Sequence, residues 1–208
     1  MMSLRRWLAK RLKPDLWKSF NWDIDKRESI EKGCFVVFDT ETTGLDLRRD
    51  EPLSLGAVKI EGLRIDLSKS YYALLKPTIG YGESVKVHGI TPLELEGARD
   101  RVEVCKDFLE YARGCILSGY FVHIDVAMVK KLVQRECKGI FYPPTLDLVS
   151  MIGKKESIPT LAELLRDFNI PASNFHNALE DAYMSALLLL RFLKEGGYSK
   201  IGDLPLSF

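Results

Sequence analysis

Two acidic residues, Asp39 and Glu41, stand at the end of an apolar run and are the first candidates for chemistry. The run from Phe35 to Phe38 is rich in β-branched and aromatic residues, which favours a buried strand. Residues two apart in a strand point to the same side, so both carboxylates enter one small volume. A divalent cation such as Mg²⁺ or Mn²⁺ relieves their repulsion, because these ions prefer carboxylate oxygens. An isolated pair could equally face solvent in a turn, so the interpretation depends on further acids.

Two more acids and a histidine occupy positions where they can join this pair. Asp125 follows a predicted buried strand at 115–121, where open α/β sheets bind their ligands, although it could instead cap a helix. Asp181 lies in the opening turns of an apolar helix predicted at 178–193, where an unpaired acid would be costly. His176 precedes Asp181 by five residues. On a regular helix that separation is about 140°, so the two side chains converge only if His176 lies in the loop before the helix.

The elements that must position these residues follow from hydrophobic periodicity. After the first strand, segments 53–60 and 71–75 predict an antiparallel meander. Later segments predict helices that alternate with strands; the helices are expected at 102–111, from Asp125 onwards, at 161–168 and at 178–193, and the strands at 115–121 and 142–147. Strands that first form a meander and then alternate with helices indicate an α/β domain with a mixed central β-sheet flanked by α-helices.

Composition and charge indicate one domain with short extensions. The 208 residues are 46% hydrophobic and 28% charged, which is enough for one substantial core. The net charge of +1 excludes a globally basic nucleic-acid binder but permits a local basic surface. We divide the chain into a basic amphipathic extension at 1–32, interrupted at Pro14, a main domain at 33–197 and a tail at 198–208. The extension is expected to pack on the domain's own surface; contact with nucleic acid, a membrane or a partner is the alternative.

Cysteine usage and hydropathy predict a cytoplasmic protein that binds no membrane. No apolar run is as long as a membrane span or the core of a signal peptide. The cysteines form no CxxC pair and lie mostly among apolar neighbours, so we expect reduced core thiols and neither disulfides nor zinc. The cysteines are Cys34, Cys105, Cys115 and Cys137. The single glutamine and four asparagines are a depletion seen in proteins from hot environments.

The motifs form an ordered set along the chain: FDTETTGLD at the end of the first strand, then VHGIT, then Asp125, then H-x-A-x-x-D ending at Asp181. From about Phe35 to Leu193 the chain resembles the DnaQ-like, DEDD-type 3′→5′ exonuclease family in its histidine-containing subclass. The subclass that uses tyrosine would place it where Asn177 stands. The resemblance implies a ribonuclease H-like fold.

The resemblance also implies a mechanism. Asp39, Glu41, Asp125 and Asp181 would hold two Mg²⁺ or Mn²⁺ ions. One ion, with His176 as general base, would generate the attacking hydroxide, and the other would stabilise the leaving 3′ oxygen. The products would be nucleoside 5′-monophosphates.

Further residues match the family's substrate contacts. The backbone of Thr42, Thr43 and Gly44 would meet the terminal sugar, where glycine permits close approach. Leu45, His88 and Gly89 would flank the terminal bases. Leu45 could equally belong to the core, and Gly89 could serve only as a turn.

One segment departs from the family's pattern. Family members often read His-Asn-Ala-x-Phe before the third acid, whereas this chain reads Tyr-Phe-Val-His-Ile before Asp125. The acid is retained but the asparagine is absent. His123 either replaces a phosphate contact or is a surface or partly buried histidine without that role.

The family resemblance favours an enzyme that digests a single-stranded DNA 3′ end, in proofreading or DNA processing. A proofreading role would require a DNA polymerase subunit as a partner in trans. The alternative is a 3′→5′ exoribonuclease of the same fold, because discrimination rests on the 2′-hydroxyl and not on the catalytic residues. A third hypothesis, a non-catalytic binding module, predicts the loss of at least one acid.

The last six residues suggest a second partner. Asp203 to Phe208 resembles the hexapeptides by which replication proteins bind the sliding clamp, with aspartate in place of the usual leading glutamine. The alternative is an apolar tail that folds back on the domain.

Overall fold

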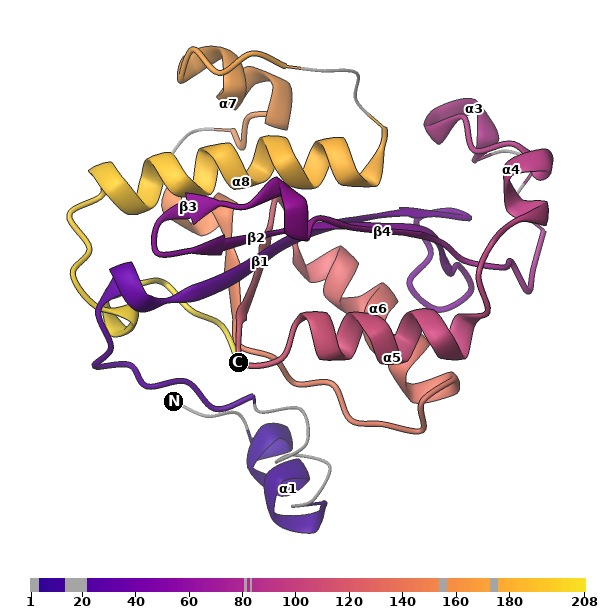
Figure 1. Cartoon of the computed structure of the whole chain (residues 1–208), viewed down its shortest axis with the longest axis horizontal. Coiled ribbons are helices and arrows are strands. Elements are labelled where there is room, and N and C mark those ends of the chain that lie inside the picture. The colour runs from indigo at the N-terminus through magenta and orange to yellow at the C-terminus, as the bar shows by residue number, and fades with distance from the viewer. Residues whose placement is uncertain (1–3, 14–21, 81, 83, 154–156, 173–175) are drawn as a thin grey trace.

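A six-stranded sheet lies between helices on both of its faces (Figure 1). The computed structural model describes residues 4–13, 22–80, 82, 84–153, 157–172 and 176–208. The strands are β1 (Cys34–Thr42), β2 (Pro52–Glu61), β3 (Arg64–Ile65), β4 (Tyr71–Leu74), β5 (Ile116–Gly119) and β6 (Thr145–Asp147). The helices are α1 (Leu4–Leu12), α3 (Val85–His88), α4 (Pro92–Glu96), α5 (Arg101–Tyr111), α6 (His123–Arg135), α7 (Leu161–Asp167) and α8 (Ala178–Glu195).

The sheet is mixed, as the order of predicted elements indicates. Its strands run in the order β3-β2-β1-β5-β6, and β4 also pairs with β2. The pairs of β2 with β1, β3 and β4 are antiparallel, so the predicted meander is confirmed. β1, β5 and β6 run parallel, and their carboxyl ends therefore meet at one edge of the sheet.

The alternation along β1 decides which side of the sheet receives the acids. Val36 and Phe38 pack into the core beneath α5 and α6, whereas Phe35 and Val37 pack into the core beneath α8. Asp39 continues the second series, because side chains two apart share a face. The acidic face of β1 is therefore the face that α8 covers.

The turn between β5 and α6 is the main departure from the predicted elements. The strand ends at Gly119, before the predicted position 121, and the helix begins at His123, before the predicted Asp125. Phe121 adopts a left-handed backbone conformation with φ of 52°. This conformation fits neither a strand nor a right-handed helix, so the strand must end before it and the helix must begin after it. The N–H of Phe121 donates to Asp147 Oδ1 at the end of β6, which fixes the turn.

All four cysteines pair, so the expectation of reduced thiols is wrong. Cys34 bonds to Cys115, and Cys105 bonds to Cys137. The first pair stands directly before Phe35 and Ile116, which are aligned in the parallel β1–β5 ladder. The second pair joins α5 to the segment after α6. Sequence separations of 81 and 32 residues hide both contacts from a reading of local motifs.

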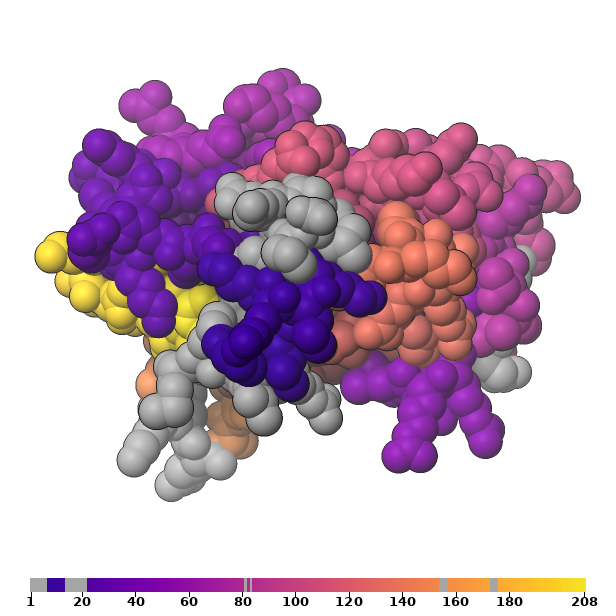
Figure 2. Space-filling model, turned by 90° about the horizontal axis from the view of Figure 1, so that it is seen from below, coloured from indigo at the N-terminus to yellow at the C-terminus, as the bar shows by residue number. Residues whose placement is uncertain are grey.

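The two ends of the chain pack on the domain. α1 contacts the core through Ala9, and Lys10 Nζ lies 2.6 Å from Asp23 Oδ2. Figure 2 shows the indigo segment of α1 on the molecular surface, on the side opposite α8. Pro14, where we expected an interruption, lies outside the described residues. At the other end Leu204 is buried, and Ser207 exchanges two backbone hydrogen bonds with Thr145 of β6. The tail thus folds back, as the alternative interpretation expects.

Among the described helices, none has both the length and the apolar character that a membrane crossing requires.

Candidate active site

Three of the four predicted acids converge on one point between β1 and α8. Asp39, Glu41 and Asp181 each offer a carboxylate oxygen, and the three oxygens lie within 4.8 Å of one another. Two of these acids come from the end of β1 and the third from the first turn of α8. The contact joins residues 140 positions apart in the sequence, as the motif order predicts.

Gly56 on β2 allows α8 to approach the sheet closely enough for this contact. It is aligned with Asp39 in the β1–β2 ladder. A Cβ atom added at Gly56 would lie 2.2 Å from Leu179 N, which is far inside van der Waals contact. The first turn of α8 therefore rests on the bare backbone of β2. The Asn177 side chain accepts the N–H groups of Leu179 and Glu180 and fixes where the helix begins.

Asp125 lies beside the three acids but is held from the other side of β1. Its Oδ1 accepts the N–H of Thr40 at 3.0 Å and the Thr40 hydroxyl at 2.7 Å. The Asp125 side chain is buried in the first turn of α6. Its charge also raises the pKa of Asp39, so the two carboxyl groups are close enough to interact. Thr40 is not among the residues predicted from the sequence, where its only signal is a hydroxyl residue between two acids.

The electrostatics of the cluster disfavour four simultaneous negative charges. Burial raises the pKa of Asp39 well above its usual value, and the other three acids add to the shift. Burial and the Asp181 carboxylate raise the pKa of Glu41 to about 7. Burial raises the pKa of Asp125 to about 7 against the opposing hydrogen bonds from Thr40. Burial also raises the pKa of Asp181.

These acids fit a divalent cation. Asp181 Oδ1 is buried and has no hydrogen-bond partner among the described residues. Clustered carboxylates with a free buried oxygen are the donor set that Mg²⁺ and Mn²⁺ prefer, and a cation would remove the mutual repulsion. Asp39, Glu41 and Asp181 are the residues that the geometry brings together as ligands.

His176 meets the condition set by its sequence position. It precedes α8 and has φ of 72°, so it is not part of the helix. Its backbone N–H donates to Asp181 Oδ2 at 3.0 Å. Its imidazole is exposed and lies close enough to Asp181 to oppose the rise in the pKa of that carboxyl. His176 and Asp181 are therefore neighbours despite their 140° separation on an ideal helix.

His88 faces the same region from α3. Burial lowers its pKa, and the nearby His176 lowers it further. His88 Nδ1 accepts the N–H of Ile90 at 3.0 Å, so a neutral ring carries its proton on Nε2. That Nε2 is buried and has no partner among the described residues. Gly89 ends α3 with φ of 70°, a conformation that favours glycine.

The segment after β1 is fixed by its own hydrogen bonds. The Thr42 hydroxyl donates to Gly44 O at 2.7 Å, and the Thr43 hydroxyl donates to Asp50 Oδ1 at 2.8 Å. A Cβ at Gly44 would meet Asp50 Oδ2 at 2.5 Å, so the loop closes tightly on that carboxylate. Leu45 is 82% exposed and does not belong to the core. Asp50 is not among the residues predicted from the sequence, because its role appears only in the closed loop.

His123 lies at the start of α6 on the surface. Its Nδ1 is 3.5 Å from Asp147 Oδ2, and its side chain is largely exposed. It does not belong to the acid cluster, which agrees with the interpretation of His123 as a surface histidine.

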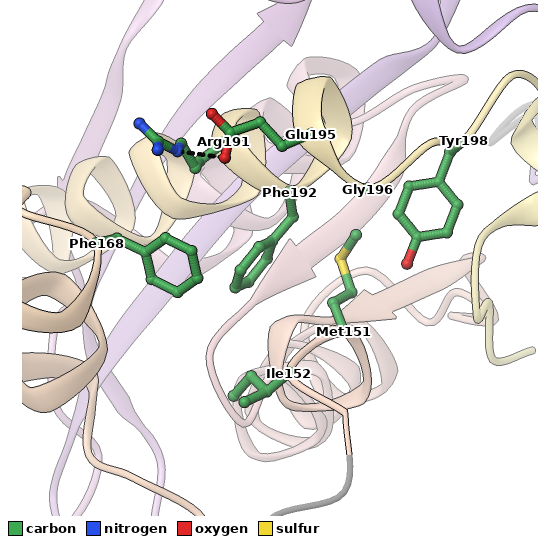
Figure 3. Close-up of a pocket in the computed structure, with 8 residues that line it drawn as sticks. All are labelled: Met151, Ile152, Phe168, Arg191, Phe192, Glu195, Gly196 and Tyr198. Atoms are coloured by element: carbon green, nitrogen blue, oxygen red, sulfur yellow. Dashed lines mark ion pairs between the residues drawn. The ribbon is translucent and has the colours of Figure 1, made fainter.

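A separate pocket of about 270 Å³ lies along the second half of α8 and contains none of the clustered acids (Figure 3). Phe168, Phe192 and Met151 form its apolar wall, and Arg191 and Glu195 pair with each other on α8 at 2.7 Å, at one edge of the pocket. No chemistry of the kind found at the acid cluster is present among these side chains.

Comparisons with known proteins identify the family of this chain. The RNase_T family, described as an exonuclease, matches residues 36–189. The DNA polymerase III subunit epsilon of Aquifex aeolicus is 30% identical over 182 residues, which cover 86% of this chain and 89% of that protein. The chain belongs to this exonuclease family.

Other members of the exonuclease family carry the domain within longer chains. The PolC-type DNA polymerase III of Thermotoga petrophila is 31% identical over 185 residues, 85% of this chain but 13% of that protein. Among solved structures, E. coli exonuclease I with a dA16 oligonucleotide has a TM-score of 0.68 at 17% identity. The match covers 78% of this chain and 41% of that one. The likeness establishes a ribonuclease H-like fold.

Proposed function

We propose that this exonuclease hydrolyses DNA from the 3′ end and releases nucleoside 5′-monophosphates, with two divalent ions held by its four acids. The observation that carries the proposal is the convergence of Asp39, Glu41 and Asp181 beside the buried Asp125. When bound, Mg²⁺ or Mn²⁺ would supply Lewis-acid activation of a water molecule and neutralise charge on the phosphate.

The residues of this chain have separate roles in the proposed reaction. His176 takes the proton of the attacking water on a ring nitrogen, since it lies outside α8, is exposed, and is tied to Asp181 through its backbone. Thr40 orients the Asp125 carboxylate. The fixed loop of Thr42, Thr43 and Gly44 presents its backbone to the terminal sugar, and Leu45, His88 and Gly89 flank the terminal bases.

Similarity to subunit epsilon supports DNA as the substrate and a DNA polymerase as the partner, because the match extends over nearly the whole of that protein. It also supports action in the cytoplasm, where replication takes place in bacteria. Proteins from very hot environments form disulfides inside the cell, so the two disulfides are compatible with the cytoplasm. The low number of glutamines and asparagines also indicates a hot environment. We do not extend the proposal to the sliding clamp, because residues 203–208 are engaged with the domain itself.

The test is digestion of matched 5′-labelled single-stranded DNA and RNA with Mn²⁺. Asp39→Ala and a chelator should abolish cleavage, whereas Asp66→Ala, an exposed acid outside the cluster, should not. Stepwise shortening of DNA from the 3′ end, faster than that of RNA, is the expected result. Faster digestion of RNA would instead assign the chain to RNA processing, and the absence of metal-dependent cleavage of both would refute the proposal.

A further inference from the structure

Tyr72 of β4 lies on the same face of the sheet as the catalytic acids. It is aligned with Gly56 of β2, and Gly56 is aligned with Asp39 of β1. Directly aligned residues on neighbouring strands project to the same side. Tyr72 therefore shares the acid face with Asp39, two strands away.

Tyr72 differs from the adjacent Tyr71, because only Tyr71 packs in the core. Tyr71 points to the opposite face, where its ring packs against Phe108 and Tyr111. Tyr72 is 43% exposed and, among the described residues, no aromatic ring packs on it. A large aromatic side chain on the active face is thus left with a free ring surface.

Tyr72 has polar and acidic neighbours. The carboxylates of Glu94 and Glu41 help burial to raise the pKa of Tyr72, and the adjacent Ser54 hydroxyl opposes the shift. Ser54 is fully buried and is aligned with Glu41 in the β1–β2 ladder. Tyr72 thus feels the charges of Glu41 on β1 and of Glu94 on α4, in addition to sharing the face of the sheet on which Asp39 lies.

These surroundings select the part of a nucleic acid that the ring can bind. The Tyr72 ring offers no positive charge to a phosphate, and the carboxylate of Glu94, which lies outside the metal-binding cluster, repels one. A nucleobase is uncharged, and every base has a flat face that stacks on an aromatic ring. We propose that the ring of Tyr72 stacks on a nucleobase of the substrate strand near its 3′ end. The inference rests on the proposed function, because it requires a nucleic acid bound at the acid cluster.

The first test compares variants that keep or remove the ring. Tyr72→Leu should raise both KM and the Kd of a fluorescent oligonucleotide about tenfold, the usual effect of losing one stacking contact, with little change in kcat. Tyr72→Phe should behave like the wild type. Tyr198→Leu, the same substitution in the segment that follows α8, is the matched control, and the melting temperature of each variant reports folding. A Tyr72→Leu variant with unchanged KM and Kd would overturn the inference.

The second test identifies the base. In oligonucleotides with one abasic site at the first, second or third position from the 3′ end, the penalty of Tyr72→Leu should vanish at one position only, because the stacking partner is then already absent. An equal penalty on every oligonucleotide would overturn the inference and indicate a purely structural role.

Binding and cleavage separate this inference from the proposed function. If the wild type binds the oligonucleotide but does not cleave it, the proposed function fails, and the Kd of Tyr72→Leu still decides the stacking contact. If the wild type neither binds nor cleaves, both proposals fail.

Discussion

At the scale of single residues, the acids have opposite effects on stability with and without a cation. Glu41 has a pKa of about 7 in the folded chain, above its usual 4.5. A carboxyl group with a raised folded pKa stabilises the fold below its unfolded pKa, and this contribution is lost as pH rises through the folded pKa. We therefore expect the melting temperature of the chelator-treated protein to fall between about pH 4.5 and pH 7. Added Mn²⁺ should reverse the fall.

A neutral substitution within the cluster is the control for this prediction. Asp39→Asn removes one of the repelling charges, so its chelator-treated form should melt above the wild type at pH 8 and should respond little to Mn²⁺. Asp66→Asn, at an exposed site, should behave like the wild type. If wild type and Asp39→Asn show the same pH dependence of melting, the cluster is not the source of the effect.

A second prediction at the scale of single residues concerns Thr40. Its hydroxyl and N–H both stabilise the charged form of Asp125. Thr40→Val keeps the shape but removes the hydroxyl, so the pKa of Asp125 should rise and the acidic limb of the pH–rate profile should move to higher pH. Loss of such an orienting contact should lower activity at pH 7 about tenfold or more. Thr40→Ser should restore the profile, and a Val variant with an unshifted profile would show that Thr40 does not act through Asp125.

At the scale of elements, the contact of α8 with β2 decides whether the cluster forms. A methyl group at Gly56 would collide with backbone atoms of Ala178 and Leu179, which cannot rotate away as a side chain would. Gly56→Ala should therefore destabilise the fold by about 3 kcal/mol and lift Asp181 away from β1. Gly80→Ala, where no atom of the described residues lies within 4 Å of the added carbon, is the matched control. Thermal melting and Mn²⁺-dependent cleavage measure the two effects; wild-type values for Gly56→Ala would contradict this account of the packing.

Local patterns predicted the elements that bear the acids, but not the contacts that orient them. The apolar run of β1 and the periodic stripe of α8 are strong signals, and the α/β class followed from their order. The hydrogen bond from Thr40 to Asp125 joins residues 85 positions apart and leaves no trace in either segment. The left-handed backbone at Phe121 arises from its bond to Asp147 on another strand, so no propensity of the sequence indicates it. Tertiary contacts of this kind decide a site's geometry and cannot be read from spacing alone.

At the scale of the whole molecule, the disulfides close two loops of different length. The bond between Cys34 and Cys115 spans 81 residues, and the bond between Cys105 and Cys137 spans 32. The loss of chain entropy in the unfolded state gives about 4 kcal/mol for each, with slightly more for the longer loop. Replacing either pair by alanines should lower the melting temperature, and a reductant should do the same to the wild type. In a variant in which all four cysteines are replaced, the reductant should leave the melting temperature unchanged. If the reductant also leaves the melting temperature of the wild type unchanged, the disulfides contribute nothing to stability.

The C-terminal tail extends the packing of the molecule across its last strand. Leu204 is buried against the core beneath α8, Ser207 pairs with Thr145, and the centroid of the Phe208 ring lies 4.5 Å from the Lys26 ammonium nitrogen. Removing residues 203–208 exposes apolar surface and the edge of β6, so it should destabilise the fold by at least about 2 kcal/mol, as loss of one buried leucine does. Leu204→Ala should reproduce most of this loss, and Ser207→Ala, which keeps the backbone pairing, should not.

Because the apolar side chains of the tail pack against the domain, the full-length chain and the truncated chain should capture a sliding clamp equally poorly. Capture by the full-length chain alone, with unchanged melting on truncation, would show that the tail detaches to bind a partner.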